Sequence, residues 1–165
     1  LSKENTLLGY GPFYYCHNFY PISISMKKVI GAGGIFYCRS TKRFLFLLRD
    51  DTKYKNKWGF PGGKIESNET IIGGLEREIN EELGIQIDIE KTIPIELFTS
   101  DDGNFCYHTF ILIIKKEFMP NLNNEHCGYA WVSMEGWPAP LHPGVFSTLK
   151  LDSIKDKIKV IVDTI

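Results

Sequence analysis

The sequence has no closely spaced cysteines, no dense basic run and no long apolar segment, and each absence excludes a class of protein. The four cysteines, Cys16, Cys38, Cys106 and Cys127, form no C-x-x-C pair, which excludes a zinc ribbon and favours free thiols in a reducing compartment. The 19 basic and 20 acidic residues are interspersed, which disfavours bulk nucleic acid as a partner. Because no apolar run could cross a bilayer and residues 1–25 lack a secretory signal, we expect a cytoplasmic protein with no membrane partner.

Length and composition favour one folded domain. With 165 residues, of which 43% are hydrophobic and 24% charged, the chain can bury one core and is too short for two ordinary domains. Residues 1–26 form an aromatic-rich N-terminal extension in which glycine and proline interrupt any helical period. We expect this extension to pack on the domain of residues 27–165 or to lie at a subunit interface, which leaves a homodimer open.

Runs of strand-forming residues predict a mixed sheet with at least two helices against it. The turn-forming tetrapeptides at residues 39–42 and 101–104 each separate two such runs, which indicates two hairpins. Near the end of the chain, Ile154, Ile158, Ile161 and Ile165 recur at helical spacing. The predicted strands span residues 29–38, 44–49, 93–100, 105–118 and 129–133.

A glycine-rich segment leads into a helix that carries several glutamates. Residues 58–63 contain a proline and three glycines, which favour irregular backbone close to a ligand. The helix is predicted over residues 69–83, with Ser67 or Asn68 as its N-cap and Gly84 as a left-handed C-cap. Its apolar stripe comprises Ile71, Ile72, Leu75, Ile79 and Leu83.

Glu78, Glu81 and Glu82 occupy one arc of this helix beside the apolar stripe. Like charges at these spacings destabilise an exposed helix by roughly 0.2–0.5 kcal/mol per pair, so we expect a cation to offset them. Mg²⁺ is the natural candidate, because it prefers carboxylate oxygens and bridges to substrate phosphates, where it assists diphosphate cleavage. These glutamates alone do not exclude an ordinary solvated helix face.

The residues around the glutamates match a longer motif. Every defined position of the pattern G-x5-E-x7-R-E-U-x-E-E-x-G-U, in which U is a bulky aliphatic residue, is present. On these residues the sequence resembles the Nudix hydrolase (MutT-like) family, and residues 58–62 look like the usual entry to its motif. The matching residues are Gly63, Glu69, Arg77, Glu78, Ile79, Glu81, Glu82, Gly84 and Ile85.

The resemblance implies an α/β fold, namely a Nudix-type α/β/α sandwich with a mixed central sheet and a metal-binding loop-helix-loop. It also implies that Glu78, Glu81 and Glu82 ligate Mg²⁺, or Mn²⁺, with help from the backbone carbonyl of Gly62. Arg77 would orient these carboxylates by ion pairing.

Two further glutamates have roles implied by the resemblance. Glu69 would support the loop and the start of the helix. The general base of family members is either a helix glutamate or a glutamate of a later loop, and Glu125 is the later candidate in this chain. The alternative for Glu125 is a solvated loop residue, and carboxylate identity alone does not decide between them.

Other residues could contact the substrate. Arg49 and Lys64 could each reach a phosphate. The adjoining Gly62 and Gly63 could supply backbone amides and carbonyls to the same site. Both cations could equally be ordinary surface residues. His108 and Trp137 could recognise a base, although core packing is favoured for both.

The complete motif favours an active Mg²⁺-dependent pyrophosphohydrolase that cleaves the diphosphate linkage of a nucleoside triphosphate or of another linked nucleoside diphosphate. The triphosphate is chosen by elimination, because residues 99–103 lack the proline or tyrosine that marks some other subfamilies. A nucleoside diphosphate sugar, of the ADP-ribose or GDP-mannose type, is the runner-up. An inactive nucleotide-binding module would be expected to have a broken Arg77-Glu78 or Glu81-Glu82 pair. An isopentenyl diphosphate isomerase-like enzyme ranks lower, because no matching Cys and Glu pair is found.

Overall fold

The computed structural model describes residues 28–165, so the predicted extension at residues 1–26 lies outside the described residues. β1 (Val29–Cys38) and β2 (Arg43–Arg49) pair antiparallel on either side of a tight turn, as predicted. Lys42 closes this turn at a φ of 56°. Within the described part of the chain, no helix combines the length and the apolar character needed to cross a membrane.

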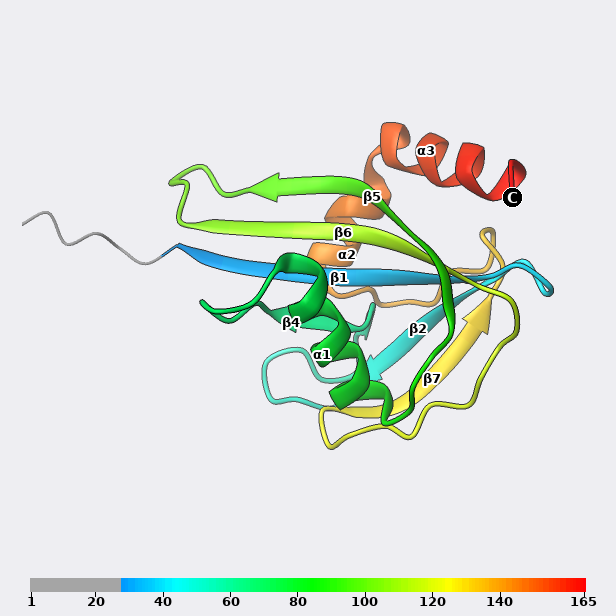
Figure 1. Cartoon of the computed structure of the whole chain (residues 1–165), viewed down its shortest axis with the longest axis horizontal. Coiled ribbons are helices and arrows are strands. Elements are labelled where there is room, and N and C mark those ends of the chain that lie inside the picture. The colour runs from blue at the N-terminus through cyan, green and yellow to red at the C-terminus, as the bar shows by residue number, and fades with distance from the viewer. Residues whose placement is uncertain (1–27) are drawn as a thin grey trace, which may run out of the picture.

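Seven strands join in one mixed sheet (Figure 1). β5 (Ile89–Thr99) and β6 (Phe105–Ile114) form the second predicted hairpin, and β6 lies parallel to β1 along its whole length. β7 (His126–Val132) pairs antiparallel with β2. The order is β3-β2-β1-β6-β5, with β4 paired to β1, so parallel and antiparallel contacts coexist as expected. The two short strands are β3 (Trp58–Gly59) and β4 (Gly62–Lys64).

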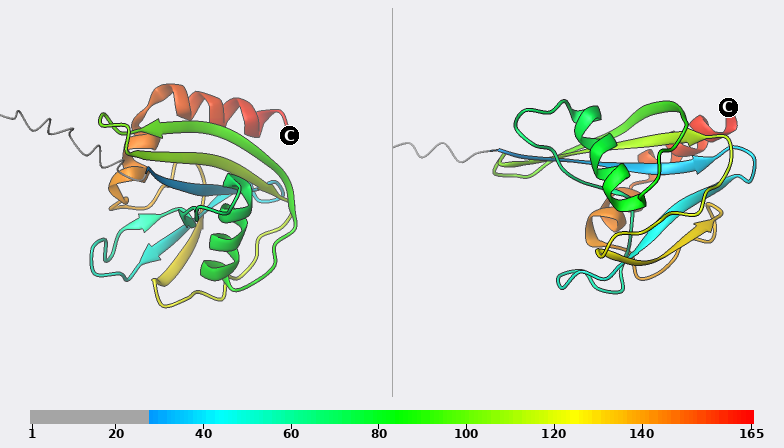
Figure 2. Two further views of the ribbon diagram at one scale, coloured as in Figure 1. Left: turned by 60° about the vertical axis from the view of Figure 1, so that its left-hand side comes forward. Right: turned by 60° about the horizontal axis from the view of Figure 1, so that its bottom comes forward.

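Helices cover both faces of the sheet (Figures 1 and 2). α1 (Ile71–Leu83) packs on one face in a core cluster with side chains such as Phe36. α2 (Pro143–Lys150) and α3 (Asp152–Asp163) pack on the other face, in a cluster that includes Ile35. Successive side chains of a strand point to opposite faces, so β1 supplies both clusters. The α/β/α sandwich is therefore confirmed.

The irregular loop predicted at residues 58–63 is wrong in part, because both of its ends enter the sheet. β3 pairs with β2, and β4 pairs with Gly31 to Gly33 of β1. Gly62 has a φ of 142°, and a Cβ atom there would lie 2.2 Å from the backbone oxygen of Ala32. Glycine at this position therefore permits the close pairing of β4 with β1. The glycines that suggested an irregular loop are what allow this strand to form.

The start of α1 also differs from the prediction. The helix begins at Ile71, and its N-cap is Thr70, whose side-chain oxygen accepts a hydrogen bond from the backbone N–H of Gly73. The predicted N-caps, Ser67 and Asn68, precede this position. At the other end the prediction is confirmed, since Gly84 adopts the left-handed conformation with a φ of 60°.

The C-terminal region contains one helix more than the isoleucine spacing predicts. α3 is the predicted helix, although it ends at Asp163 and so excludes Ile165. α2 was not expected in the proline-rich connection. Pro143 occupies the first turn of α2, where its missing N–H has no helical partner to lose. The Nδ1 atom of His142 accepts from the backbone N–H of Gly144 and caps the helix.

Candidate functional site

α1 presents its carboxylates beside β4. Leu75, Ile79 and Leu83 are buried and set the rotation of the helix on the sheet. Ile72 is 39% exposed, so its place in the predicted apolar stripe is wrong. Gly74 allows a close approach, because a Cβ atom there would lie 2.6 Å from the Ile65 side chain. This packing turns the acidic arc of the helix toward the Gly62-Gly63 backbone.

Glu82 is the buried member of the acidic arc, with 3% of its surface exposed. Its Oε2 atom accepts a hydrogen bond of 2.7 Å from the backbone N–H of Gly62. The pKa of Glu82 is raised to about 8, chiefly by burial and in part by the nearby carboxylates of Glu125 and Glu78, against the lowering effects of the Gly62 hydrogen bond and of Arg49. The charged form of Glu82 is therefore disfavoured at this buried position unless a cation lies beside it.

Arg77 balances part of this charge. Its guanidinium donates to Glu69 at 2.7 Å, to Glu78 at 2.9 Å and to Glu81 at 3.3 Å. It also donates to the backbone carbonyl of Lys64 at 2.9 Å. The carboxylates of Glu69 and Glu78 raise the pKa of Arg77, so the guanidinium stays charged while it orients them.

Gly63 lies against the carboxylate of Glu78. A Cβ atom at Gly63 would lie 2.4 Å from Glu78 Oε2 and 2.5 Å from its Cδ. The absence of a side chain is therefore what lets this carboxylate approach the backbone of β4. Glu81, in contrast, has 57% of its side chain exposed and lies at the solvent edge of the arc.

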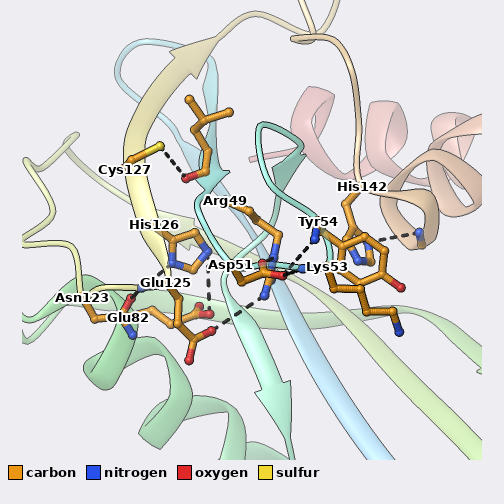
Figure 3. A network of polar contacts seen from close by, with 12 residues as sticks. Arg49, Asp51, Lys53, Tyr54, Glu82, Asn123, Glu125, His126, Cys127 and His142 are labelled. Atoms are coloured by element: carbon orange, nitrogen blue, oxygen red, sulfur yellow. Dashed lines mark hydrogen bonds and ion pairs between the residues drawn. The ribbon is translucent and has the colours of Figure 1, made fainter.

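A second polar group joins β2 to the start of β7 (Figure 3). The Arg49 guanidinium donates to Asp51 and lies 3.7 Å from Glu125 Oε2. Burial alone would raise the pKa of Asp51, but Arg49 and the backbone N–H groups of Tyr54 and Lys53 lower it to about 2. Arg49 is thus held between two carboxylates, one of which is the candidate base Glu125.

His126 is a site residue that the sequence prediction missed. Its side chain is 1% exposed, and its Nε2 atom faces Glu82 Oε1 at 3.9 Å. Burial lowers the pKa of His126 to about 4, with a further contribution from Arg49, so the ring is neutral at physiological pH. The available signal was its position directly after Glu125, but this signal is weak, because adjacent residues of a strand point to opposite sides. Asp51 was missed as well, although it follows Arg49 by two residues.

The remaining candidates lie apart from this group. Lys64 is exposed, and only its backbone carbonyl contacts the site, through Arg77. His108 stacks on Phe110 at 6.4 Å on β6. Trp137 packs beside Phe46 against the cluster under α2 and α3. The packing interpretation of His108 and Trp137 agrees with these contacts.

The donor set of the acidic arc suits a hard divalent cation. Among residues 28–165, no three carboxylate, histidine or cysteine side chains converge on one point. The protein contacts explain this, because Arg77 engages Glu78 and Glu81 while Glu82 turns to Gly62. The single Arg77 guanidinium faces several carboxylates, and the buried carboxylate of Glu82 lies near those of Glu125 and Glu78. All these carboxylates offer oxygen atoms, which hard divalent cations prefer as ligands. A cation held by this arc would offset the excess negative charge.

Comparison with known proteins identifies the family of this chain. A family model described as NUDIX domain matches residues 27–150. Mouse nucleoside diphosphate-linked moiety X motif 6 is 27% identical over 117 residues, which cover 68% of this chain but only 37% of that protein. The 8-oxo-dGTP diphosphatase of Escherichia coli K12 is 42% identical over 60 residues, which cover 36% of this chain and 46% of that protein. A solved MutT structure, described as from Aliivibrio salmonicida and Vibrio cholerae, aligns with a TM-score of 0.63 and 21% identity over 79% of this chain and 99% of that one. This last likeness concerns the fold.

Proposed function

Because this chain belongs to the NUDIX domain family, we propose that it hydrolyses the diphosphate linkage of a nucleoside triphosphate with Mg²⁺ or Mn²⁺ as cofactor. The observation that supports this most is the meeting of Glu78 and Glu82 with the Gly62-Gly63 backbone. The similarity to an 8-oxo-dGTP diphosphatase supports the triphosphate as first choice. A nucleoside diphosphate sugar is the alternative that the experiment below tests.

The ion would be held by Glu78, Glu81 and Glu82, with the backbone carbonyl of Gly62 as a further oxygen donor. When bound, the ion would neutralise negative charge on the phosphates and lower the pKa of a water molecule. Arg77 has the task of orienting the carboxylates, because its planar fork reaches Glu78 and Glu81 together.

Glu125 is the proposed acceptor of the proton from the attacking water. About half of its side chain is exposed, at 53%, so the carboxylate can meet water. The Arg49 guanidinium lies 3.7 Å from its Oε2 atom and can hold the carboxylate in place. Arg49 itself is the proposed phosphate contact, since it is a cation beside the acidic arc. Lys64 is the second proposed phosphate contact, from the exposed end of β4.

A substrate panel with Mg²⁺ and product identification tests the proposal. A nucleoside triphosphate should yield either a monophosphate and pyrophosphate or a diphosphate and phosphate. A nucleoside diphosphate sugar should yield a nucleoside monophosphate and a sugar phosphate. Turnover of the sugar compound alone would replace the first choice by the alternative, and turnover of neither would contradict the proposal.

Charge-removing variants test the residue roles. Glu81→Gln and Glu82→Gln should each lose about 10²-fold or more in kcat, because they remove oxygen donors for the ion. Glu76→Gln is the matched control, since Glu76 is exposed on the same helix and outside the acidic arc. Unchanged kcat in both site variants would remove these residues from the mechanism.

A further inference from the structure

A buried ring nitrogen faces Glu82 without a hydrogen-bond partner. The Nε2 atom of His126 has no partner, although the side chain is 1% exposed. Figure 3 places this ring above the Glu82 carboxylate, with Asn123 to the lower left, near the second ring nitrogen. The separation of 3.9 Å between Nε2 and Glu82 Oε1 is too long for a direct hydrogen bond. A buried polar atom in this position requires an explanation.

The contacts of Asn123 fix the tautomer of the ring. The backbone N–H of Glu125 donates to Asn123 Oδ1 at 3.1 Å, so this side-chain atom must be the oxygen. The same oxygen lies 3.4 Å from Nδ1 of His126. Two acceptors would repel each other, so Nδ1 carries the hydrogen in the neutral ring. Nε2 is then left with a lone pair that points at a carboxylate oxygen.

A lone pair and a carboxylate oxygen can share a water molecule that donates to both, or a cation, and the acidic arc beside them favours a cation. A proton shared between them would need a separation of about 2.6–2.8 Å. A metal ion about 2.1 Å from each atom spans up to about 4.2 Å, and the observed 3.9 Å lies within this range. Metal-bound histidines also donate their other N–H to an oxygen of the protein, as His126 does to Asn123.

We propose that Nε2 of His126 is a ligand of the divalent cation bound by Glu82, and that this site therefore favours Mn²⁺ or a similar transition ion over Mg²⁺. The inference rests on the proposed function, because it concerns the same cation. Imidazole suits transition ions, whereas Mg²⁺ prefers oxygen. The second oxygen of Glu82 is held by Gly62, so Glu82 and His126 are both oriented by the protein. The oxygens of the other proposed ligands, together with water and phosphate oxygens, would complete the coordination.

Pulsed electron paramagnetic resonance of bound Mn²⁺ tests this ligand directly and without turnover. The wild-type protein with Mn²⁺ and no nucleotide should show coupling to a directly bound nitrogen. Labelling the histidines with ¹⁵N should change that coupling to the ¹⁵N pattern. The coupling should be lost in His126→Gln and retained in His108→Gln, because His108 stacks on Phe110 away from the acidic arc.

Calorimetry supplies a second readout. His126→Gln should lower the affinity for Mn²⁺ by about tenfold and that for Mg²⁺ by less than about twofold. Bound Mn²⁺ with no histidine coupling in the wild type would overturn the inference and leave the proposed function intact. Absence of binding of either ion, with or without nucleotide, would overturn both. If His126→Gln fails to fold, the ¹⁵N-labelled wild-type spectrum alone decides the question.

Discussion

The contact between Gly63 and Glu78 leads to a sharp prediction for Gly63→Ala. A methyl group at this position would lie 2.4 Å from Glu78 Oε2, whereas ordinary contact with carbon begins at about 3.5 Å. The carboxylate must therefore move by about 1 Å, and a misplacement of this size costs about 10²-fold in rate. The displaced atoms form the end of a flexible side chain, so the free energy of unfolding should change little. We expect kcat to fall about 10²-fold in a protein that remains folded.

The assay compares kcat of Gly63→Ala with that of the wild type on the preferred substrate of the panel, with urea unfolding as the folding measurement. Gly136→Ala is the matched control, because a Cβ atom there would lie 3.4 Å from Ser133 Oγ and far from the acidic arc. A folded Gly63→Ala protein with kcat within a few-fold of the wild type would refute the idea that Glu78 acts from its observed position.

Gly74→Ala should lower the free energy of unfolding in urea by about 1–3 kcal/mol, because its Cβ atom would overlap Ile65 at 2.6 Å. Gly73→Ala should change it by less than about 1 kcal/mol in either direction, since only Thr70 Oγ1 is near, at 3.0 Å. The pKa of Asp51 is lowered to about 2, so its stabilisation is present above an unfolded pKa of about 3.9 and is lost as the pH falls toward 2. As the pH is lowered from about 4 to 2, the free energy of unfolding measured by urea titration should therefore fall less in Asp51→Asn than in the wild type. Chelation by EDTA should abolish turnover, and added Mg²⁺ or Mn²⁺ should restore it; full activity after exhaustive chelation would contradict a cation requirement.

The sequence was sufficient to predict the elements that local patterns specify. The hairpin of β1 and β2 follows from two apolar runs around a short turn, and the end of α1 follows from Gly84. The family motif added what periodicity alone does not provide, namely the α/β/α arrangement that brings the acidic helix to β4. These features depend on residues close together in the chain, so they can be read before the fold is known.

The features that were missed depend on contacts between distant segments. β4 exists because Gly62 approaches Ala32 of β1, which no local pattern shows. His126 reaches Glu82 only because β7 pairs with β2 beside the end of α1. Ile72 was wrongly predicted to be buried, because an apolar stripe on a helix does not show how much of the stripe the sheet covers. For Gly62 and His126 the partner lies tens of residues away in the sequence, and only the assembled sheet identifies it.

The distribution of charge around α1 explains why one glutamate of the arc matters most for cation binding. Arg77 shares its guanidinium among Glu69, Glu78 and Glu81, so each of these carboxylates has a cationic neighbour within 3.3 Å. Glu82 has instead one backbone N–H, a neutral imidazole and the favourable charge of Arg49, which makes no hydrogen bond to it, and it is the most buried of the four. A cation gains most where charge is least compensated and water is excluded. The free energy of ion binding should therefore depend more on Glu82 than on Glu81. Calorimetry with Mn²⁺ should show a larger loss of affinity for Glu82→Gln than for Glu81→Gln. The reverse order would place the ion at the solvent edge of the helix.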